Sequence, residues 1–201
     1  MRSLGRLLVG LVALGGCLLR TADPPRFFRP TSATLDAAAG DEADPPVTEG
    51  IPIRLRAVRS EPFLRERIVW RVSDVEYGFY EQRRWIDLPA HYVERALRIR
   101  LQSTPGLRLT TDPRAAALRV DVLAFDDLLA PTHAANVALA VALEDPARSR
   151  PLERTFSAQA AIGGDDPTSM AKAMGQALDD AVAQVADAVK LSLQGHQGRR
   201  P

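Results

Sequence analysis

The sequence has few cysteines and histidines, and its net charge is close to zero. One cysteine occurs in 201 residues, so no disulfide can form within the chain. The histidines, His91, His133 and His196, are too far apart for a metal-binding spacing and are interpreted as helix-surface, loop and tail residues. The formal net charge of +1 is too small for binding driven by counterion release from phosphates, which predicts no nucleic-acid partner.

Sequence motifs of catalysis are also missing. The chain has no G-x-S-x-G turn and no G-x-G-x-x-G fingerprint, and the segment IGGDD is too short to be a phosphate-binding loop. Three aspartate pairs could supply acid and base carboxylates, but adjacent side chains on a strand or helix point apart. The pairs are interpreted as a loop, a helix cap and a solvated helix face: Asp126 with Asp127, Asp165 with Asp166, and Asp179 with Asp180. The sequence therefore predicts a protein that is not an enzyme and that binds no metal or cofactor.

The first 16 residues have the organisation of a secretory signal peptide. Arg2 and Arg6 form a basic start, residues 7–14 are apolar, and small residues precede Cys17. The apolar run is far shorter than the ~20 residues needed to cross a bilayer. The segment is therefore predicted to be an export signal and not a membrane-spanning helix.

The segment LGGC at residues 14–17 resembles the lipobox of bacterial lipoproteins. In a lipobox the cysteine sulfur receives a diacylglyceryl group and becomes the mature N-terminus, so the resemblance implies lipidation of Cys17 and a membrane anchor. In enterobacterial lipoproteins, an aspartate directly after the cysteine favours the inner membrane. Leu18 occupies this position here, so the resemblance favours the outer membrane. The alternative is an ordinary signal peptide whose cleavage region happens to contain a cysteine.

Residues 17–50 are predicted to form a flexible linker after the lipidated cysteine, with a span on the order of 30 Å. The segment has two Pro-Pro pairs, many small or polar residues and no sustained periodicity. Such a composition buries too little apolar surface to compensate for the entropy lost on ordering. The exception is residues 26–29, where Phe27 and Phe28 form a candidate short edge strand.

Residues 51–195 are predicted to form a single domain, followed by a disordered tail at residues 196–201. Alternating apolar and polar residues predict strands, and apolar residues at helical spacing predict helices. The expected strands are residues 51–58, 67–77, 107–111, 117–127, 136–145 and 151–162, and the expected helices are residues 87–106 and 165–193. The order β-β-α-β-β-β-β-α indicates an α+β fold, in which two helices pack on one face of a mixed sheet.

Two features of this domain are predicted in more detail. The second helix begins with Asp166 as its N-cap and Pro167 as its first residue. In residues 136–145, Ala138, Ala140 and Ala142 alternate with larger apolar residues. Because these alanines are small, a helix is expected to lie close against the face that they form.

Aromatic residues are few, but several are concentrated between residues 70 and 85. Arginines flank them, and aromatic residues together with arginine are typical of the positions that dominate binding energy in protein interfaces. The candidate partner-facing residues are Tyr77, Phe79, Tyr80, Arg83, Arg84 and Trp85. The alternative places Trp70 and Trp85 in the core beneath the first helix.

Several segments of the domain resemble the ABC-type transport auxiliary lipoproteins, the PqiC-like family. The matching pieces are FLRERIVWR at residues 63–71, WIDLP at residues 85–89, the strand ALRVDVLAFDD, and the region from FSAQAAI through the final helix. The resemblance extends over residues 51–193. The sequence departs from the family pattern after the cysteine, where Phe27-Phe28-Arg29-Pro30 stands in place of the usual Tyr-Tyr-x-Leu strand.

The resemblance implies a function in lipid transport. Lipoproteins of this family work with an ABC permease, its ATPase and an MCE-domain protein in the cell envelope, facing the periplasm. The family has no catalytic residues that could be assigned to positions of this sequence. A homo-oligomer is left as an alternative, because members of the family can form rings. The rival hypothesis is a lipoprotein of similar build that activates or assembles another envelope machine, in peptidoglycan synthesis or outer-membrane export.

Overall fold

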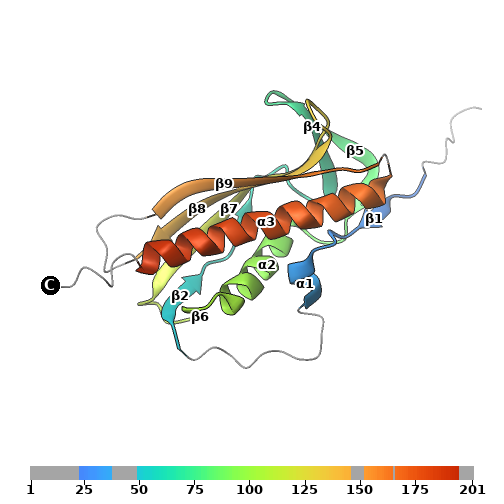
Figure 1. The fold of residues 1–201 in the computed structure, drawn as a ribbon. Helices are drawn as coiled ribbons and strands as arrows, with labels where there is room; N and C mark the ends of the chain where they lie inside the picture. The colour runs from blue at the N-terminus through green and yellow to red at the C-terminus, as the bar shows by residue number, and fades with distance from the viewer. Residues whose placement is uncertain (1–22, 38–48, 146–151, 165, 195–201) are drawn as a thin grey trace, which may run out of the picture.

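The computed structural model describes residues 23–37, 49–145, 152–164 and 166–194 (Figure 1). The strands in this part are β1 (Arg26–Phe28), β2 (Ile51–Leu55), β3 (Arg59–Ser60), β4 (Arg67–Ser73), β5 (Glu76–Trp85), β6 (Leu107–Leu109), β7 (Ala116–Leu128), β8 (Ala134–Glu144) and β9 (Leu152–Ala161). The helices are α1 (Ala33–Ala37), α2 (Pro89–Ser103) and α3 (Pro167–Gln194). The predicted signal peptide, Cys17, Asp165 and the predicted tail with His196 lie outside the described residues.

One mixed sheet contains all of these strands, and its longest strand, β7, lies at its centre. β8 pairs with β7 antiparallel, and β9 continues the sheet antiparallel beyond β8. The other edge of β7 is shared by β2, β3 and β4, which pair with it in parallel at successive positions. β6 extends the sheet beyond β2, and β5 followed by β1 extends it beyond β4. The predicted α+β class with a mixed sheet is therefore confirmed.

The two long helices pack on the same face of the sheet (Figure 1). α3 has 28 residues and lies against β8 and β9, while α2 lies beside it near β6 and β7. Val137 and Leu139 of β8 are fully buried in one core with Leu178 and Val182 of α3. Burial of each such side chain contributes about 1.5–3 kcal/mol, so the packing of α3 on this face is a main source of stability.

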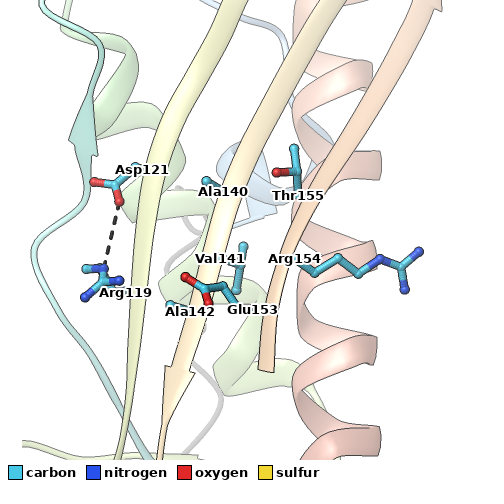
Figure 2. A pocket seen from close by; sticks show the side chains of 8 residues that line it. All are labelled: Arg119, Asp121, Ala140, Val141, Ala142, Glu153, Arg154 and Thr155. Carbon is cyan, nitrogen blue, oxygen red and sulfur yellow. Dashed lines mark ion pairs between the residues drawn. The ribbon is translucent and has the colours of Figure 1, made fainter. Parts of the chain in front are cut away.

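The prediction that a helix covers the alanine face of β8 is wrong. Ala138 and Ala140 lie on the opposite face from the core, and Ala140 is paired with Thr155 of β9 (Figure 2). The helix itself supplies the small residues, because Ala177 and Ala181 of α3 are fully buried against the sheet. The branched side chains of β8 therefore fill the space beneath α3, and the alanines face outward.

Part of the predicted linker belongs to the folded domain. β1 pairs in parallel with β5, as the aromatic pair indicated. The following segment is held against α3, where Asp179 accepts hydrogen bonds from the Ser32 hydroxyl at 2.6 Å and the Ala33 N–H at 2.8 Å. The chain passes so close to Gly175 that a Cβ there would collide with the Thr31 carbonyl. The interpretation of Asp179 and Asp180 as a solvated helix face is wrong for Asp179, because these hydrogen bonds hold its carboxylate, and is confirmed for Asp180, which is exposed.

Residues 67–77, predicted as one strand, contain a turn. β4 ends at Ser73, and the chain reverses at Asp74 and Val75 into the 10-residue strand β5. The Val75 N–H donates to the Ser73 hydroxyl oxygen at 3.4 Å, and Arg71 Nη1 lies 3.2 Å from Asp74 Oδ1. Val75 and Tyr77 follow the alternating residues Ile68, Trp70 and Val72 with no glycine or proline between them, so the sequence carries no strong turn signal here. The resulting β4–β5 hairpin carries most of the candidate aromatic residues.

α3 begins as the sequence predicts. Asp166 Oδ1 accepts hydrogen bonds from the Thr168 N–H at 2.8 Å and the Ser169 N–H at 3.0 Å. The Ser169 hydroxyl donates to Asp166 Oδ2 at 2.6 Å. The hydrogen bond from the Ser169 hydroxyl, together with the main-chain bonds, lowers the pKa of Asp166 from 3.8 to about 2. The ionised carboxylate therefore stabilises the start of the helix.

We expect acid to weaken this cap. Because the pKa of Asp166 is lower in the folded chain than in the unfolded chain, the stabilisation is present above a pH of about 4 and is lost as the pH falls towards about 2. Asparagine caps a helix without titrating, so the Tm of the Asp166→Asn variant should fall less than that of the wild type between roughly pH 5 and pH 2. Circular dichroism melting curves measure the difference, and equal decreases in Tm would contradict the prediction.

Candidate functional site

Aromatic and arginine side chains lie exposed together on one face of the β4–β5 hairpin. Phe63, Tyr77 and Phe79 are 39%, 48% and 39% exposed. The Phe63 and Tyr77 rings meet edge-on with their centroids 5.9 Å apart, and the Arg67 guanidinium lies 4.9 Å from the Phe79 centroid. We name Phe63, Arg67, Arg71, Tyr77 and Phe79 the hairpin surface. A partner that covers this surface would bury three rings, and the cation–π contacts hold the rings in place beforehand.

Side-chain alternation decides which of the predicted interface residues belong to the hairpin surface. Tyr77 and Phe79 point to one face of β5, whereas Tyr80 points to the other and donates its hydroxyl proton to Asp127 Oδ2 at 2.7 Å. Burial raises the pKa of the Tyr80 hydroxyl, and the neighbouring Asp127 carboxylate raises it further. The prediction that Tyr80 faces a partner together with Tyr77 and Phe79 is therefore wrong.

Arg83 and Arg84 contact their own strand. The Arg83 guanidinium lies 4.1 Å from the centroid of the Tyr80 ring. Arg84 Nη1 donates to the main-chain carbonyls of Tyr80 and Arg83, each at 3.1 Å. β1 pairs with this end of β5, where Arg26 is opposite Arg83 and Phe27 is opposite Arg84. The two arginines therefore belong to the β1 edge of the sheet and not to the hairpin surface.

The two tryptophans occupy different environments. Trp85 is 1% exposed and packs edge-on against Phe125 at 5.4 Å and Tyr92 at 6.4 Å, so its assignment to an interface is wrong. It is the last residue of β5, and its contacts with Tyr92 of α2 and Phe125 of β7 place its ring between the helix and the sheet. Trp70 is partly exposed, and its ring covers Gly78 on the paired strand, where a Cβ would not fit. The alternative of a core position is thus correct for Trp85 and not for Trp70.

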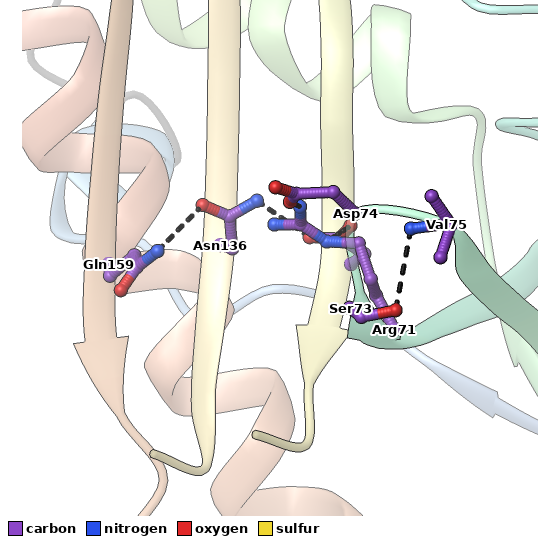
Figure 3. A network of polar contacts seen from close by, with 7 residues as sticks. Arg71, Ser73, Asp74, Val75, Asn136 and Gln159 are labelled. Atoms are coloured by element: carbon purple, nitrogen blue, oxygen red, sulfur yellow. Dashed lines mark hydrogen bonds and ion pairs between the residues drawn. The ribbon is translucent and has the colours of Figure 1, made fainter. Parts of the chain in front are cut away.

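A buried ion pair connects the hairpin to the centre of the sheet. Arg71 Nε lies 2.9 Å from Asp126 Oδ2, and Asp126 is 2% exposed. Asn136 Nδ2 donates to Asp126 Oδ1 at 2.7 Å, and Gln159 Nε2 donates to Asn136 Oδ1 at 3.3 Å (Figure 3). Burial raises the pKa of Asp126, against the opposing effects of Asn136 and Arg71. The network therefore holds β4 to β7, β8 and β9 through a single row of side chains.

Asp127 makes the equivalent connection on the opposite face of β7. It is 1% exposed, and Asp127 Oδ1 lies 2.9 Å from His133 Nε2 while Oδ2 accepts the Tyr80 hydroxyl. The interpretation of Asp126 and Asp127 as loop residues is wrong, because both belong to β7 and point to opposite faces of the sheet. His133 does lie between strands, as predicted, and it joins the β7–β8 connection to this carboxylate. Together the two aspartates position both strands of the hairpin.

These contacts combine an exposed aromatic and arginine surface with a buried polar network beneath it. Within the described residues, no group of three or more histidine, cysteine, aspartate or glutamate side chains is arranged to hold a metal ion. The helices of the same residues include none that is long and apolar enough to cross a membrane. The fold and the hairpin surface define an α+β domain in which a buried polar network supports an exposed aromatic and arginine surface.

The family follows from comparison with known proteins. Residues 34–186 match the family model described as ABC-type transport auxiliary lipoprotein component, and this match covers more than half of the chain. The chain therefore belongs to that family, as the resemblance in the sequence predicted. The family is a lipoprotein component of ABC-type transport, which implies the cell envelope, and it is not a known enzyme family. None of the curated proteins compared with the chain matches it.

Solved structures share the fold at low sequence identity. Protein XCC0632 from Xanthomonas campestris, described by the family model DUF330, has a TM-score of 0.68 at 17% identity, covering 86% of this chain and 99% of that one. An uncharacterized protein has a TM-score of 0.64 at 16% identity, covering 83% and 99%. The hypothetical protein CT253 from Chlamydia trachomatis has a TM-score of 0.51 at 10% identity, covering 73% and 99%. At these identities the likeness concerns the fold alone.

Proposed function

We propose that the protein is a non-enzymatic auxiliary component of an ABC transporter that moves lipids together with an MCE-domain protein, and that it tethers this transporter to a membrane. The observation that carries the proposal is the family match over residues 34–186. The likeness of FLRERIVWR and WIDLP to segments of the PqiC-like lipoproteins adds the MCE-domain partner and the lipid cargo. An auxiliary component of this kind needs an anchor and a docking surface, and it needs no catalytic group.

The hairpin surface is the site that we assign to the MCE-domain protein. Three half-exposed rings lie next to two arginines there, which is the composition of residues that dominate binding energy. The hairpin is also held in one orientation, since Asp126 and Asp127 connect β4 and β5 to the sheet from both faces. Binding through such a preorganised surface loses little conformational entropy.

Cys17 is the anchor in this proposal, with the domain facing the periplasm from the outer membrane. Asp23, where the described part begins, is six positions after Cys17. At ~3.5 Å per residue, an extended chain of this length spans at most about 20 Å. The pairing of β1 with β5 holds the chain to the domain soon after Asp23. The tether is therefore shorter than the span of about 30 Å expected for a flexible linker of residues 17–50. The anchor would thus keep the β1 edge of the sheet close to the membrane.

Site-specific cross-linking tests the proposed partner. A photoreactive amino acid at position 79 of the full-length chain is expected to cross-link to an MCE-domain protein in intact envelopes. The same amino acid at position 191 is the control, because Leu191 is 70% exposed on α3, away from the hairpin surface. Adducts with a peptidoglycan synthase or an export component at position 79 would instead support the rival function.

Labelling with a radioactive fatty acid tests the anchor. We expect the wild type to incorporate label and to fractionate with membranes, because an acylated cysteine adds about 0.8 kcal/mol of membrane affinity per buried CH₂ group. The Cys17→Ala variant should lose the label and leave the membrane fraction. Label that persists in this variant would refute the assignment of Cys17.

A further inference from the structure

A hollow of about 650 Å³ opens at the carboxyl ends of β2 and β6, beside α2. β2 and the residues after it contribute one wall, the residues around the end of β6 contribute another, and α2 contributes the third. The lining residues are Arg54, Leu55, Arg56, Ala57, Arg98, Gln102, Leu109, Thr110 and Thr111. This site lies on other elements than the hairpin surface, so an inference about it does not depend on the proposed function.

The charges of the hollow are of one sign. Three of its lining residues are arginines, and none is acidic. Arg56 and Arg98 each have a carboxylate partner outside the lining, since Arg56 Nη1 lies 3.7 Å from Glu144 Oε2 and Arg98 Nη2 lies 2.8 Å from Glu94 Oε1. The lining itself therefore presents positive charge to any molecule that enters.

Arg54 contributes a buried polar atom that has no partner. Among the described residues, the Nε atoms of Arg54, Arg71 and Arg100 are buried without a hydrogen bond, and of these three arginines only Arg54 lines the hollow. Buried polar groups in folded proteins are almost always paired, and an unpaired one indicates a water or an ion that the protein alone does not supply. A guanidinium requires an acceptor, so the missing partner is an anion or another oxygen acceptor.

The second hollow of the sheet provides an internal comparison. It has a volume of about 450 Å³ and lies over β7, β8 and β9 (Figure 2). Its lining contains Arg119 and Arg154 but also Asp121 and Glu153, and Arg119 Nε lies 3.9 Å from Asp121 Oδ2. Its charges are thus balanced within the lining, whereas those of the hollow at Arg54 are not.

We propose that the hollow at Arg54 binds a phosphate-bearing anion. Guanidinium groups bind phosphate oxygens through paired charge-assisted hydrogen bonds, and Arg54, Arg56 and Arg98 bring three of them to one site. The hydroxyls of Thr110 and Thr111 can donate as well, since Thr110 Oγ1 accepts from the Asp112 N–H and keeps its own proton available. Leu55 and Leu109 add an apolar wall next to these donors. This chemistry fits a phosphate of either free or lipid origin.

Calorimetric titration of the full-length chain at constant ionic strength tests the site and distinguishes the two sources. The probes are inorganic phosphate and soluble dihexanoyl phosphatidylglycerol. We expect at least one of them to bind the wild type, and we expect the Arg54→Gln variant to bind it about tenfold more weakly, as for the loss of one charged hydrogen-bonding partner. The control is Arg65→Gln, which removes the same charge at an exposed position where Arg65 Nε donates to the Pro62 carbonyl.

Each outcome decides the proposal. Phosphate binding that weakens in Arg54→Gln and not in Arg65→Gln supports a site for free phosphate, and the same pattern with phosphatidylglycerol alone supports a lipid headgroup. Binding of neither probe, or equal weakening in both variants, overturns the proposal. If Arg54→Gln does not fold, Arg98→Gln replaces it, because Arg98 is half-exposed and its loss removes one of the three guanidinium groups.

Discussion

Replacing both Tyr77 and Phe79 with alanine is expected to weaken binding of the proposed MCE-domain partner by about 100-fold. Both rings are exposed on the hairpin surface, and partner binding would bury them beside Arg67 and Arg71. Truncation of two aromatic side chains at the centre of an interface removes contacts that the surrounding residues do not replace. Titration of the purified partner into each full-length protein measures the change in Kd.

The variant should remain folded, which separates a loss of contact from a loss of structure. Both side chains are already half-exposed, so their removal should change the free energy of unfolding by less than about 1 kcal/mol. Leu191→Ala is the matched control, since Leu191 is an exposed apolar residue on α3. We expect it to bind as the wild type does. A double variant with unchanged Kd would exclude the hairpin surface as the docking site.

The Asp126→Ala variant is expected to lower the free energy of unfolding by about 3–5 kcal/mol. It leaves Arg71, whose side chain is 16% exposed, without its buried carboxylate, and it leaves the Asn136 amide without its acceptor. Both groups remain in the sheet interior, where an unpaired polar group is costly. Chemical denaturation measures the change, and hydrogen exchange should show that β4 and β5 open first.

Asp74→Ala is the control for this prediction, because Arg71 contacts both carboxylates. Arg71 Nη1 lies 3.2 Å from Asp74 Oδ1, but Asp74 is 98% exposed. An exposed ion pair contributes little, so Asp74→Ala should cost less than about 1 kcal/mol. Similar losses in the two variants would contradict the view that burial of Asp126, and not the number of ion pairs to Arg71, holds the hairpin.

The helices show how far local patterns lead. Asp166 and Pro167 specify where α3 begins, because a cap acts on the backbone two or three residues away. The alternation in β7 and β8 likewise specifies two faces for each strand. It does not specify which face a helix will cover, and the expectation for Ala138 and Ala140 failed because the small residues that permit close packing are on α3 instead.

The candidate site was predictable in composition and not in geometry. The concentration of aromatic and arginine residues near the hairpin is evident from the sequence, and Tyr77 and Phe79 belong to the resulting surface. Phe63 and Arg67 were missed, because strict alternation through the two-residue turn at Asp74 and Val75 places Arg67 and Phe79 on opposite faces. The register shifts in the β4–β5 pairing bring these two side chains together. The burial of Trp85 could not be read from its neighbours, because it depends on Phe125 from another strand.

The class of the fold, the start of α3 and the family to which the chain belongs were all predictable from the order of residues. All three follow from interactions within a few residues or from the order of apolar positions along the chain. Packing in three dimensions, in contrast, brings partners to Asp126, Asp127 and Asp179, and it leaves the buried Arg54 Nε without one among the described residues. The physical reason is that a charge is stable or costly according to the groups around it in space, and those groups lie on strands and helices far away in the sequence.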